Sequence, residues 1–306
     1  MNLPGRVTVV EVGPRDGLQN EPEPVATPIK IEFVNRLSDT GLSCIEVSSF
    51  VSPAWIPQLA DATDVYTHIE QKKDVVYPVL VPNERGMERA LEAGAKTIAI
   101  FNAASETFNQ KNINASIAKA FQRLEKVAAV ATSENIAIRG YVSCVLGCPY
   151  EGAIDPATVG IVARDLFQLG CYEISLGDTI GIGTPLRARR LLDAVTQHIG
   201  LDQVAVHFHD TRGQALANVL ACLEYGVTTV DASVAGLGGC PYAEGASGNL
   251  ATEDLVYMLH GMEIETGIDL DLLIAAGRFI TKTMGREPAS RLGRLPKGRR
   301  QPRYTT

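Results

Sequence analysis

His207 and His209 are separated by one residue at the end of an apolar run. The preceding residues Val204, Ala205 and Val206 indicate a buried β-strand, and Asp210 follows the second histidine. Alternate residues of a strand point to the same face, so the two imidazoles are expected on one side, about 7 Å apart along the backbone. Neutral imidazole suits divalent transition metals, and two histidines at a strand's C-terminal end favour a metal site over hydrogen-bonded core histidines.

Two further polar residues are candidates to complete this metal site. Asp16 follows the first predicted strand, which in a closed barrel lies next to the eighth strand and one removed from the seventh, the histidine strand. Asn249 offers an amide oxygen. Two nitrogens, one carboxylate and one amide oxygen, with two open positions, favour Mg²⁺ or Mn²⁺ over structural zinc. Asn249 is equally able to hold its own loop in shape.

The segment 236–249 is too rich in glycine for regular structure and too long for a simple turn. Glycine permits positive φ and close backbone approach, so we expect a lid over the site. Cys240 lies in this loop, between Gly239 and Pro241. Because unpaired cysteines are usually buried, a thiol in an exposed loop favours a chemical function when the lid closes.

Predicted strands and helices alternate along the chain. The strands cover 7–12, 43–48, 75–81, 97–102, 138–145, 172–176, 204–209 and 227–234, and predicted helices separate them over about 28–40, 61–71, 84–93, 114–133, 156–169, 185–198, 215–225 and 251–261. This alternation predicts an α/β fold, a (β/α)8 TIM barrel, with an additional C-terminal helix over 269–284. An open doubly wound sheet is the alternative, but its dinucleotide fingerprint after the first strand is absent. We expect one catalytic domain over 1–285 and a mobile basic tail over 286–306.

TIM barrels carry their chemistry at the C-terminal ends of the strands. The polar residues predicted there, besides the histidines, are Arg15, Asp16, Glu46, Asn102, Ser143, Asp178, Thr179 and Asp210. Two of them, Asp178 and Asp210, are equally suited to capping the helices that follow.

Composition excludes several classes of protein. The 306 residues carry 28 basic and 35 acidic side chains, a net charge of −7, which argues against binding to nucleic acid. No apolar run reaches the about 20 residues needed to span a membrane, and no signal peptide precedes the first strand, so we expect a cytoplasmic protein. The six cysteines are scattered without a Cys-x-x-Cys pair, which predicts free thiols.

Several segments resemble the hydroxymethylglutaryl-CoA lyase family. They are Gly13–Glu21, Lys111–Asn114, Ser175–Gly181, His207–Thr211 and the loop Gly236–Asn249. The resemblance extends to about Leu259. The loop motif is specific, whereas the Arg-Asp-Gly and His-x-His elements also occur in isopropylmalate and homocitrate synthases on the same barrel. The resemblance implies divalent-metal-dependent retro-Claisen cleavage of 3-hydroxy-3-methylglutaryl-CoA to acetyl-CoA and acetoacetate, as in leucine degradation and ketone body formation.

The resemblance also implies a role for each matching residue. Asp16, His207, His209 and Asn249 are similar to the ligands of the divalent cation, and Arg15, Asp178, His207 and Cys240 to the catalytic residues. The positions similar to substrate contacts are Arg15, Gln19, Glu46 and Thr179, with Lys111 and Asn112 for coenzyme A, and Glu253 resembles a supporting acidic residue. Arg212 stands where an aromatic residue is common, and no cysteine follows Cys240. The arginine leaves the ligand positions intact, whereas the missing cysteine, together with the lack of an N-terminal extension, leads us to expect a bacterial cytoplasmic form. The family suggests a homodimer.

For this reaction, the cation would make the tertiary hydroxyl easier to deprotonate, and Arg15 would stabilise the developing enolate oxygen. We expect Asp178, with His207 as a relay, to take the hydroxyl proton and Cys240 to protonate the acetyl-CoA carbanion, although these two roles are interchangeable. The alternatives are a lyase for a longer branched 3-hydroxyglutaryl-CoA, such as the isohexenyl homologue, a related acyl-condensing synthase, and an inactive barrel that serves as a binding protein.

Overall fold

The computed structural model describes residues 3–238 and 248–296. Within them, one sheet contains nine parallel strands in the order β2-β1-β9-β8-β7-β6-β5-β4-β3. The strands are β1 (Thr8–Glu11), β2 (Cys44–Ile45), β3 (Ser48–Ser49), β4 (Val79–Leu80), β5 (Thr97–Ala103), β6 (Ala137–Ser143), β7 (Cys171–Asp178), β8 (Val204–Phe208) and β9 (Thr229–Ala232).

The two end strands of this order, β2 and β3, are halves of one predicted strand. β2 pairs with β1, and β3 pairs with β4, so the sheet closes on itself through the intervening residues Glu46 and Val47. Their backbone amides confirm the switch, because Glu46 N donates to Glu11 O and Val47 N donates to Pro78 O. The predicted (β/α)8 TIM barrel is confirmed, with its second strand interrupted at Glu46.

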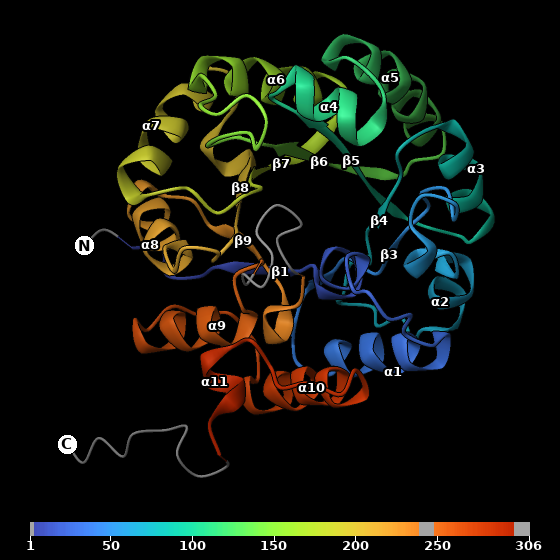
Figure 1. The fold of residues 1–306 in the computed structure, drawn as a ribbon, viewed down its shortest axis with the longest axis vertical. Helices are drawn as coiled ribbons and strands as arrows, with labels where there is room; N and C mark the ends of the chain where they lie inside the picture. The colour runs from blue at the N-terminus through green and yellow to red at the C-terminus, as the bar shows by residue number, and fades with distance from the viewer. Residues whose placement is uncertain (1–2, 239–247, 297–306) are drawn as a thin grey trace.

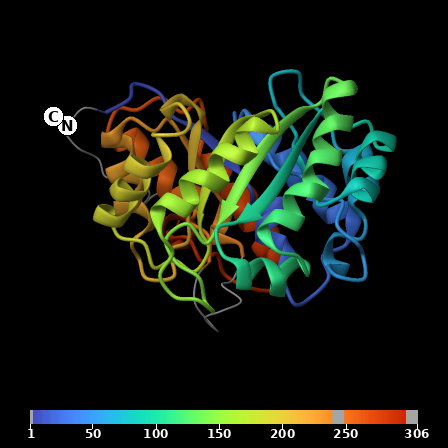
Figure 2. The same cartoon turned by 90° about the horizontal axis from the view of Figure 1, so that it is seen from above.

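The helices surround the barrel (Figure 1), and Figure 2 shows them packed outside the strands. They are α1 (Thr27–Ser38), α2 (Ala62–His68), α3 (Glu84–Glu92), α4 (Glu106–Ile113), α5 (Ile117–Ser133), α6 (Pro156–Gln168), α7 (Pro185–Val195), α8 (Ala215–Tyr225), α9 (Thr252–Gly261), α10 (Leu270–Thr283) and α11 (Arg291–Arg294). Helix α6 illustrates the local cause: Asp155 accepts a hydrogen bond from Ala157 N, and Pro156 occupies the first helical position. The additional C-terminal helix is confirmed as α10.

Three of the short helical elements that the sequence did not predict are α4, η1 (Gly13–Gly17) and α11. Helix α4 is capped by Ser105, whose side chain accepts from Phe108 N, and residues Gly13–Gly17 form a π-helical turn, η1, directly after β1. The third, α11, lies in the segment predicted to be a mobile tail.

Residues 286–296, where a mobile tail is predicted to begin, include α11 and contact α9 and α10. The carboxylate of Asp254 in α9 accepts hydrogen bonds from the backbone N–H groups of Arg291 and Leu292, and the Arg278 guanidinium donates to Gly293 O. These side chains satisfy both ends of α11, which the tail's basic composition alone did not reveal. The rest of the predicted tail, 297–306, lies outside the described residues.

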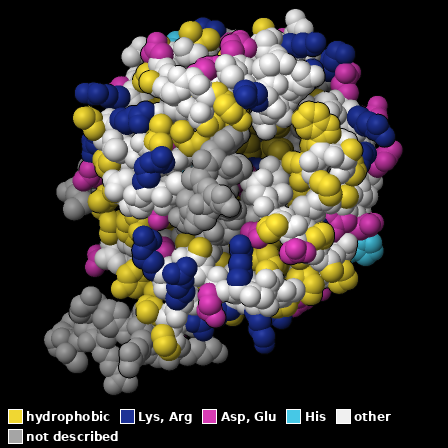
Figure 3. Space-filling model, in the orientation of Figure 1, with side chains coloured by type: hydrophobic (Ala, Val, Ile, Leu, Met, Phe, Trp, Pro, Cys, Tyr) yellow, Lys and Arg dark blue, Asp and Glu magenta, His cyan; other side chains and the backbone are white. Residues whose placement is uncertain are grey.

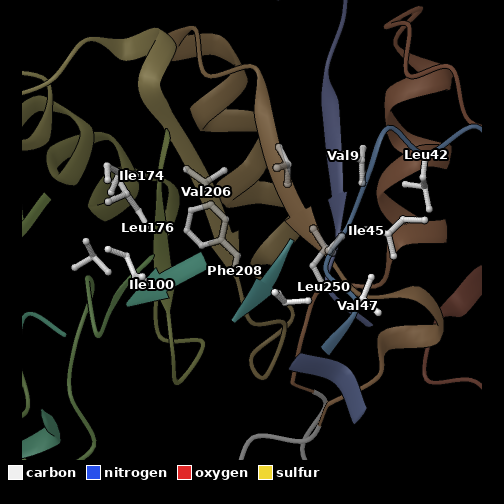
Figure 4. Close-up of a cluster of buried hydrophobic side chains, with 14 of the residues drawn as sticks. Val9, Leu42, Ile45, Val47, Ile100, Ile174, Leu176, Val206, Phe208 and Leu250 are labelled. Atoms are coloured by element: carbon white, nitrogen blue, oxygen red, sulfur yellow. The ribbon is translucent and has the colours of Figure 1, made fainter. Parts of the chain in front are cut away.

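The hydrophobic core fills the layer between strands and helices. Val206 and Phe208 of β8 belong to this core, as do Ile174 and Leu176 of β7 (Figure 4). On the opposite face of the same strands, His207 and Ser175 are buried polar side chains that face the barrel interior. The fold therefore separates an apolar outer layer from a polar interior beneath the mouth.

Candidate active site

Asp16, His207 and His209 converge at the mouth of the barrel. Each offers one ligand atom, and these atoms all lie within 4.8 Å of one another. The two imidazole rings have centroids 5.5 Å apart, as the strand alternation predicted. Asp16 reaches them because η1 turns the chain inward immediately after β1. Of the predicted ligands, these three form a cluster that could hold a metal ion.

Asn249, the fourth predicted ligand, touches this cluster. It forms an isolated antiparallel bridge with His209, and its side-chain amide donates to Asp16 Oδ2 at 2.8 Å and to Leu237 O at 3.1 Å. Asn249 was predicted either to bind the metal or to hold its loop in shape, and its position is compatible with both roles. It contacts the candidate ligand Asp16, and its bond to Leu237 O joins the two ends of the loop.

The protonation states of His209 and Asp16 fit a divalent cation. Burial, followed by the neighbouring His207, lowers the pKa of His209 to about 4, so its imidazole is neutral at pH 7. Burial would raise the pKa of Asp16, but Arg15 and both histidines lower it to about 2, which keeps the carboxylate charged. His209 Nδ1 is buried and has no hydrogen-bond partner among the described residues. Two imidazoles and one charged carboxylate are donors that such an ion accepts.

His207 is oriented from behind by a carboxylate. Its Nδ1 lies 3.4 Å from Asp231 Oδ2, and its Nε2 lies 4.0 Å from Asp16 Oδ2. Burial would lower the pKa of His207, but the hydrogen bond to Asp231 and the charges of Asp16 and Asp231 raise it above the usual value. This arrangement directs Nε2 toward the candidate metal centre, as second-shell carboxylates do for ligating histidines.

Arg15 lies beside the cluster with its guanidinium fixed on two sides. One terminal nitrogen donates to Asp16 Oδ1 at 2.5 Å, and the other lies 2.8 Å from Glu46 Oε2. Burial would lower its pKa, but Glu46 and Asp16 hold the pKa above its ordinary value, so the charge is permanent. Its Nε is buried and has no partner within the described part of the chain. Arg15 therefore offers a preorganised positive charge.

A cavity of about 640 Å³ opens above these residues. In Figure 3, a hollow edged by hydrophobic side chains lies near the centre of the face. The lining includes five charged or imidazole groups and several polar and aromatic ones: Arg15, Asp16, Arg123, His207, His209, Gln19, Thr179, Asn112, Phe101, Tyr141 and Trp55. Its size and its mixed lining are typical of a small-molecule site.

The predicted substrate contacts divide into two groups. Gln19, Thr179 and Asn112 line the cavity, and Gln19 Oε1 is buried without a partner among the described residues. Lys111 is exposed, and its ammonium lies over the Tyr150 ring, 4.4 Å from the centroid. Glu46 is fully buried, is not among the lining residues and contacts Arg15, as the resemblance to a carboxylate that supports the arginine implied. Its contact with the substrate stays a prediction.

Asp178 does not reach the cavity. It is fully buried, and its two carboxylate oxygens accept hydrogen bonds from Ile182 N at 3.2 Å and Gly183 N at 2.8 Å. Its neighbours Gly177 and Thr179 line the cavity, so the backbone directs Asp178 away from it. Burial raises its pKa, and its removal of a substrate proton stays a prediction. Its function here is to fold the loop after β7.

Glu253 supports the loop from below. Its Oε2 accepts from Ala235 N at 2.8 Å, and its Oε1 accepts from Ser290 Oγ at 3.3 Å. Ala235, at φ 60°, lies in the 3₁₀ turn η4 (Val234–Gly236), which begins the predicted lid. The supporting position predicted for Glu253 agrees with these contacts. Cys240 and most of the lid, 239–247, lie outside the described residues.

Three functional neighbours were missed in the sequence. Arg139 and Tyr141 of β6 and Asp231 of β9 are buried, and all three join the polar interior below the cavity. The sequence did contain one indication of this network. Asp231 is a charged residue in the middle of an apolar strand, and a buried charge requires a buried partner. The sequence did not identify which partner that was.

Fold and site together define a TIM-barrel protein with a candidate metal centre at the C-terminal ends of its strands. A model of the family described as HMGL-like matches residues 6–280. The chain therefore belongs to the HMGL-like family.

The similar proteins carry consistent names. The chain is 58% identical over 290 residues to the mitochondrial hydroxymethylglutaryl-CoA lyase of Homo sapiens, covering 95% of this chain and 89% of that protein. It is 56% identical to the cytoplasmic 3-hydroxy-3-methylglutaryl-CoA lyase of Rattus norvegicus, over 95% of this chain and 84% of the relative. Both relatives are named as lyases, although their compartments differ.

Solved structures agree with these relatives. A hydroxymethylglutaryl-CoA lyase from Pseudomonas aeruginosa has a TM-score of 0.94 and 53% identity, covering 95% of this chain and 97% of that one. An HMG-CoA lyase from Acinetobacter baumannii, in complex with coenzyme A and 3-methylmalate, has a TM-score of 0.92 and 40% identity, covering 97% of each chain. Among the described residues, no helix combines the length and apolarity that crossing a membrane requires.

Proposed function

We propose that this protein is a hydroxymethylglutaryl-CoA lyase, which cleaves 3-hydroxy-3-methylglutaryl-CoA to acetyl-CoA and acetoacetate. The observation that carries the proposal is the convergence of Asp16, His207 and His209 beside Arg15 in one cavity. The family membership and the names of relatives that cover nearly the whole chain support the same activity.

Asp16, His207, His209 and Asn249 would hold the divalent cation, Mg²⁺ or Mn²⁺. When bound, such an ion acts as a Lewis acid toward hydroxyl and carboxylate oxygens of a substrate. Neutral His209 and charged Asp16 support this assignment, because neither needs to lose a proton at pH 7 before it binds the ion.

Arg15 stabilises the enolate oxygen of the acetyl-CoA that leaves. Asp16 and Glu46 fix its guanidinium before the substrate arrives, and a preorganised donor of this kind contributes about 3 kcal/mol to the transition state. Burial strengthens the effect because the surrounding dielectric constant is low.

Proton transfer is assigned to Cys240, since the carboxylate of Asp178 is engaged by its own loop. A Cys240 thiolate that accepts the hydroxyl proton becomes the thiol that then protonates the carbanion, so one residue balances both transfers. The sequence around Cys240 supports this role, because its many glycines permit close backbone approach.

The substrate contacts follow from the lining of the cavity. Gln19 offers an unpaired buried oxygen to the acyl group, and Thr179 lies nearby, whereas Lys111 and Asn112 of α4 are assigned to coenzyme A. We also propose a homodimer in a bacterial cytoplasm, although the relatives include mitochondrial as well as cytoplasmic proteins.

One assay tests the function. Purified protein is supplied with Mg²⁺ or Mn²⁺ and then with a chelator, and acetyl-CoA release is measured from the methyl thioester and from the isohexenyl homologue. We expect cleavage of the methyl compound, its loss with chelator and its recovery when metal is restored. Cleavage of the longer compound alone would replace the substrate assignment, and full turnover without metal would overturn the role of the cation.

A further inference from the structure

A closed ring of side chains beneath the cavity connects His207 with Arg15. In order, the ring passes through His207, Asp231, Arg139, Tyr141, Glu46, Arg15 and Asp16, which returns to His207. These residues come from distant parts of the chain. Arg139 is fully buried and lies between Asp231 and Tyr141 in the ring.

Arg139 uses its guanidinium in three directions. Its Nε donates to Glu173 Oε1 at 2.7 Å, its two terminal nitrogens donate to the two oxygens of Asp231 at 2.8 and 3.2 Å, and one of them also donates to the Tyr141 hydroxyl oxygen at 2.8 Å. The side chain is fully buried and is not among the residues that line the cavity. Arg139 therefore acts on the site only through its neighbours.

The first branch leads to the candidate metal centre. Besides Arg139, Asp231 accepts from Ser175 Oγ at 2.7 Å, and its Oδ2 lies 3.4 Å from His207 Nδ1. A carboxylate behind a ligating histidine fixes the ring and leaves the other nitrogen as the donor to the ion. Arg139 donates to both oxygens of Asp231, so it fixes the carboxylate that in turn orients the His207 ring.

The second branch leads to the guanidinium of Arg15. Since Arg139 can only donate, the Tyr141 oxygen must accept from it, and the Tyr141 hydroxyl is then free to donate to Glu46 Oε2 at 3.0 Å. The same Glu46 oxygen lies 2.8 Å from Arg15. The orientation of Arg15 thus depends on Arg139 through two intermediate groups.

We propose that Arg139 is a positioning residue that holds the metal ligand His207 and the catalytic Arg15 at the same time, through Asp231 on one side and Tyr141 with Glu46 on the other. Its planar fork is required, because a lysine ammonium at this position cannot hold both oxygens of Asp231 and the Tyr141 oxygen in the same geometry. The activity part of this inference rests on the proposed lyase function, whereas the metal-binding part does not.

The first measurement is Mn²⁺ affinity of the chelator-treated protein, by calorimetric titration. We expect Asp231→Asn and Arg139→Lys each to weaken Mn²⁺ binding about 10- to 100-fold, the range for second-shell changes. Tyr141→Phe should leave Mn²⁺ affinity unchanged because it cuts only the branch to Arg15. The matched control Arg164→Lys alters a partly exposed pair with Asp165 and should change nothing.

The second measurement is the steady-state kinetics of acetyl-CoA release at saturating metal. Arg139→Lys and Tyr141→Phe should each lower kcat about 10- to 100-fold with little change in KM, as expected for a misplaced catalytic group. The double variant should be no slower than the slower single variant, since both cut the same branch.

Several results would overturn the inference. They are a folded Arg139→Lys protein with wild-type Mn²⁺ affinity and kcat, a double variant whose losses simply add, and a Tyr141→Phe protein that loses Mn²⁺ affinity as strongly as Asp231→Asn. If Arg139→Lys fails to fold, the contrast between Asp231→Asn and Tyr141→Phe decides. If the wild type releases no acetyl-CoA but Asp231→Asn still weakens Mn²⁺ binding, the lyase assignment fails and the metal branch stands.

Discussion

The side-chain amide of Asn249 donates to Oδ2 of Asp16 at 2.8 Å, although 233 positions separate the two residues in the chain. This contact ties the end of the glycine-rich loop to the turn after the first strand. The loop thus ends directly at the candidate metal centre, where His209 also pairs with Asn249.

Asn249→Ala should weaken Mn²⁺ binding about 10-fold or more, because it removes a candidate ligand and frees Asp16 from its amide contact. Calorimetric titration of the chelator-treated protein measures this affinity. Asn83→Ala is the matched control: Asn83 caps α3, so the change should cost about 1 kcal/mol of stability and leave Mn²⁺ affinity intact. Wild-type affinity in Asn249→Ala would limit Asn249 to shaping its loop.

Arg15→Lys should lower kcat/KM about 100-fold or more, since an ammonium cannot span Asp16 and Glu46 while facing the developing oxyanion. Steady-state acetyl-CoA release measures the loss. Arg36→Lys, in an exposed pair with Glu32, provides the control for the same chemical change. Near-normal turnover by Arg15→Lys would show that positive charge alone is sufficient.

Asp178→Asn should keep kcat within a few-fold of the wild type but lower the free energy of unfolding by about 1 to 3 kcal/mol. In the wild type, the backbone N–H groups of Ile182 and Gly183 each donate to a different carboxylate oxygen of Asp178. The asparagine amide has only one acceptor oxygen, so one of these hydrogen bonds is lost. Denaturant titration and kinetics on the same preparation separate the two effects. A folded variant with kcat reduced a thousand-fold would restore Asp178 as a proton-transfer group.

Buried Glu253 should make the protein less stable as the pH rises. Burial raises its pKa to about 8 from an ordinary 4.5, so between these values the folded state binds a proton that the unfolded state has lost. Stability from this group is full below about pH 4.5 and falls as the pH approaches 8.

Glu253→Gln mimics the protonated form and should flatten this part of the pH profile of the melting temperature. Differential scanning calorimetry at pH 5 and pH 8 tests this expectation. The change in melting temperature between the two pH values should differ between wild type and Glu253→Gln by at least about 2 °C. The control is Glu84→Gln, which alters an exposed pair with Lys126. Parallel profiles for wild type and Glu253→Gln would exclude Glu253 as the source.

The alternation of strands and helices identified the barrel from sequence, because each element is formed by short-range patterns that the chain repeats. The same local logic placed His207 and His209 on one face, and the Arg-Asp and loop motifs identified Asp16 and Asn249 as their partners. Residues whose function depends on local spacing were therefore accessible without coordinates.

Only the tertiary structure decided which way Asp178 points and what Arg139 contacts. Asp178 is the last residue of β7, a strand whose two faces point to the cavity and to the outer layer, and a shift of one residue along the backbone changes the face. Arg139 meets Asp231, 92 positions away, and that pairing follows from closure of the barrel. Strand periodicity is local, whereas the partners of buried charges are set by the packing of the whole barrel. For this reason the sequence determined the fold and the candidate metal ligands but not the network that positions them.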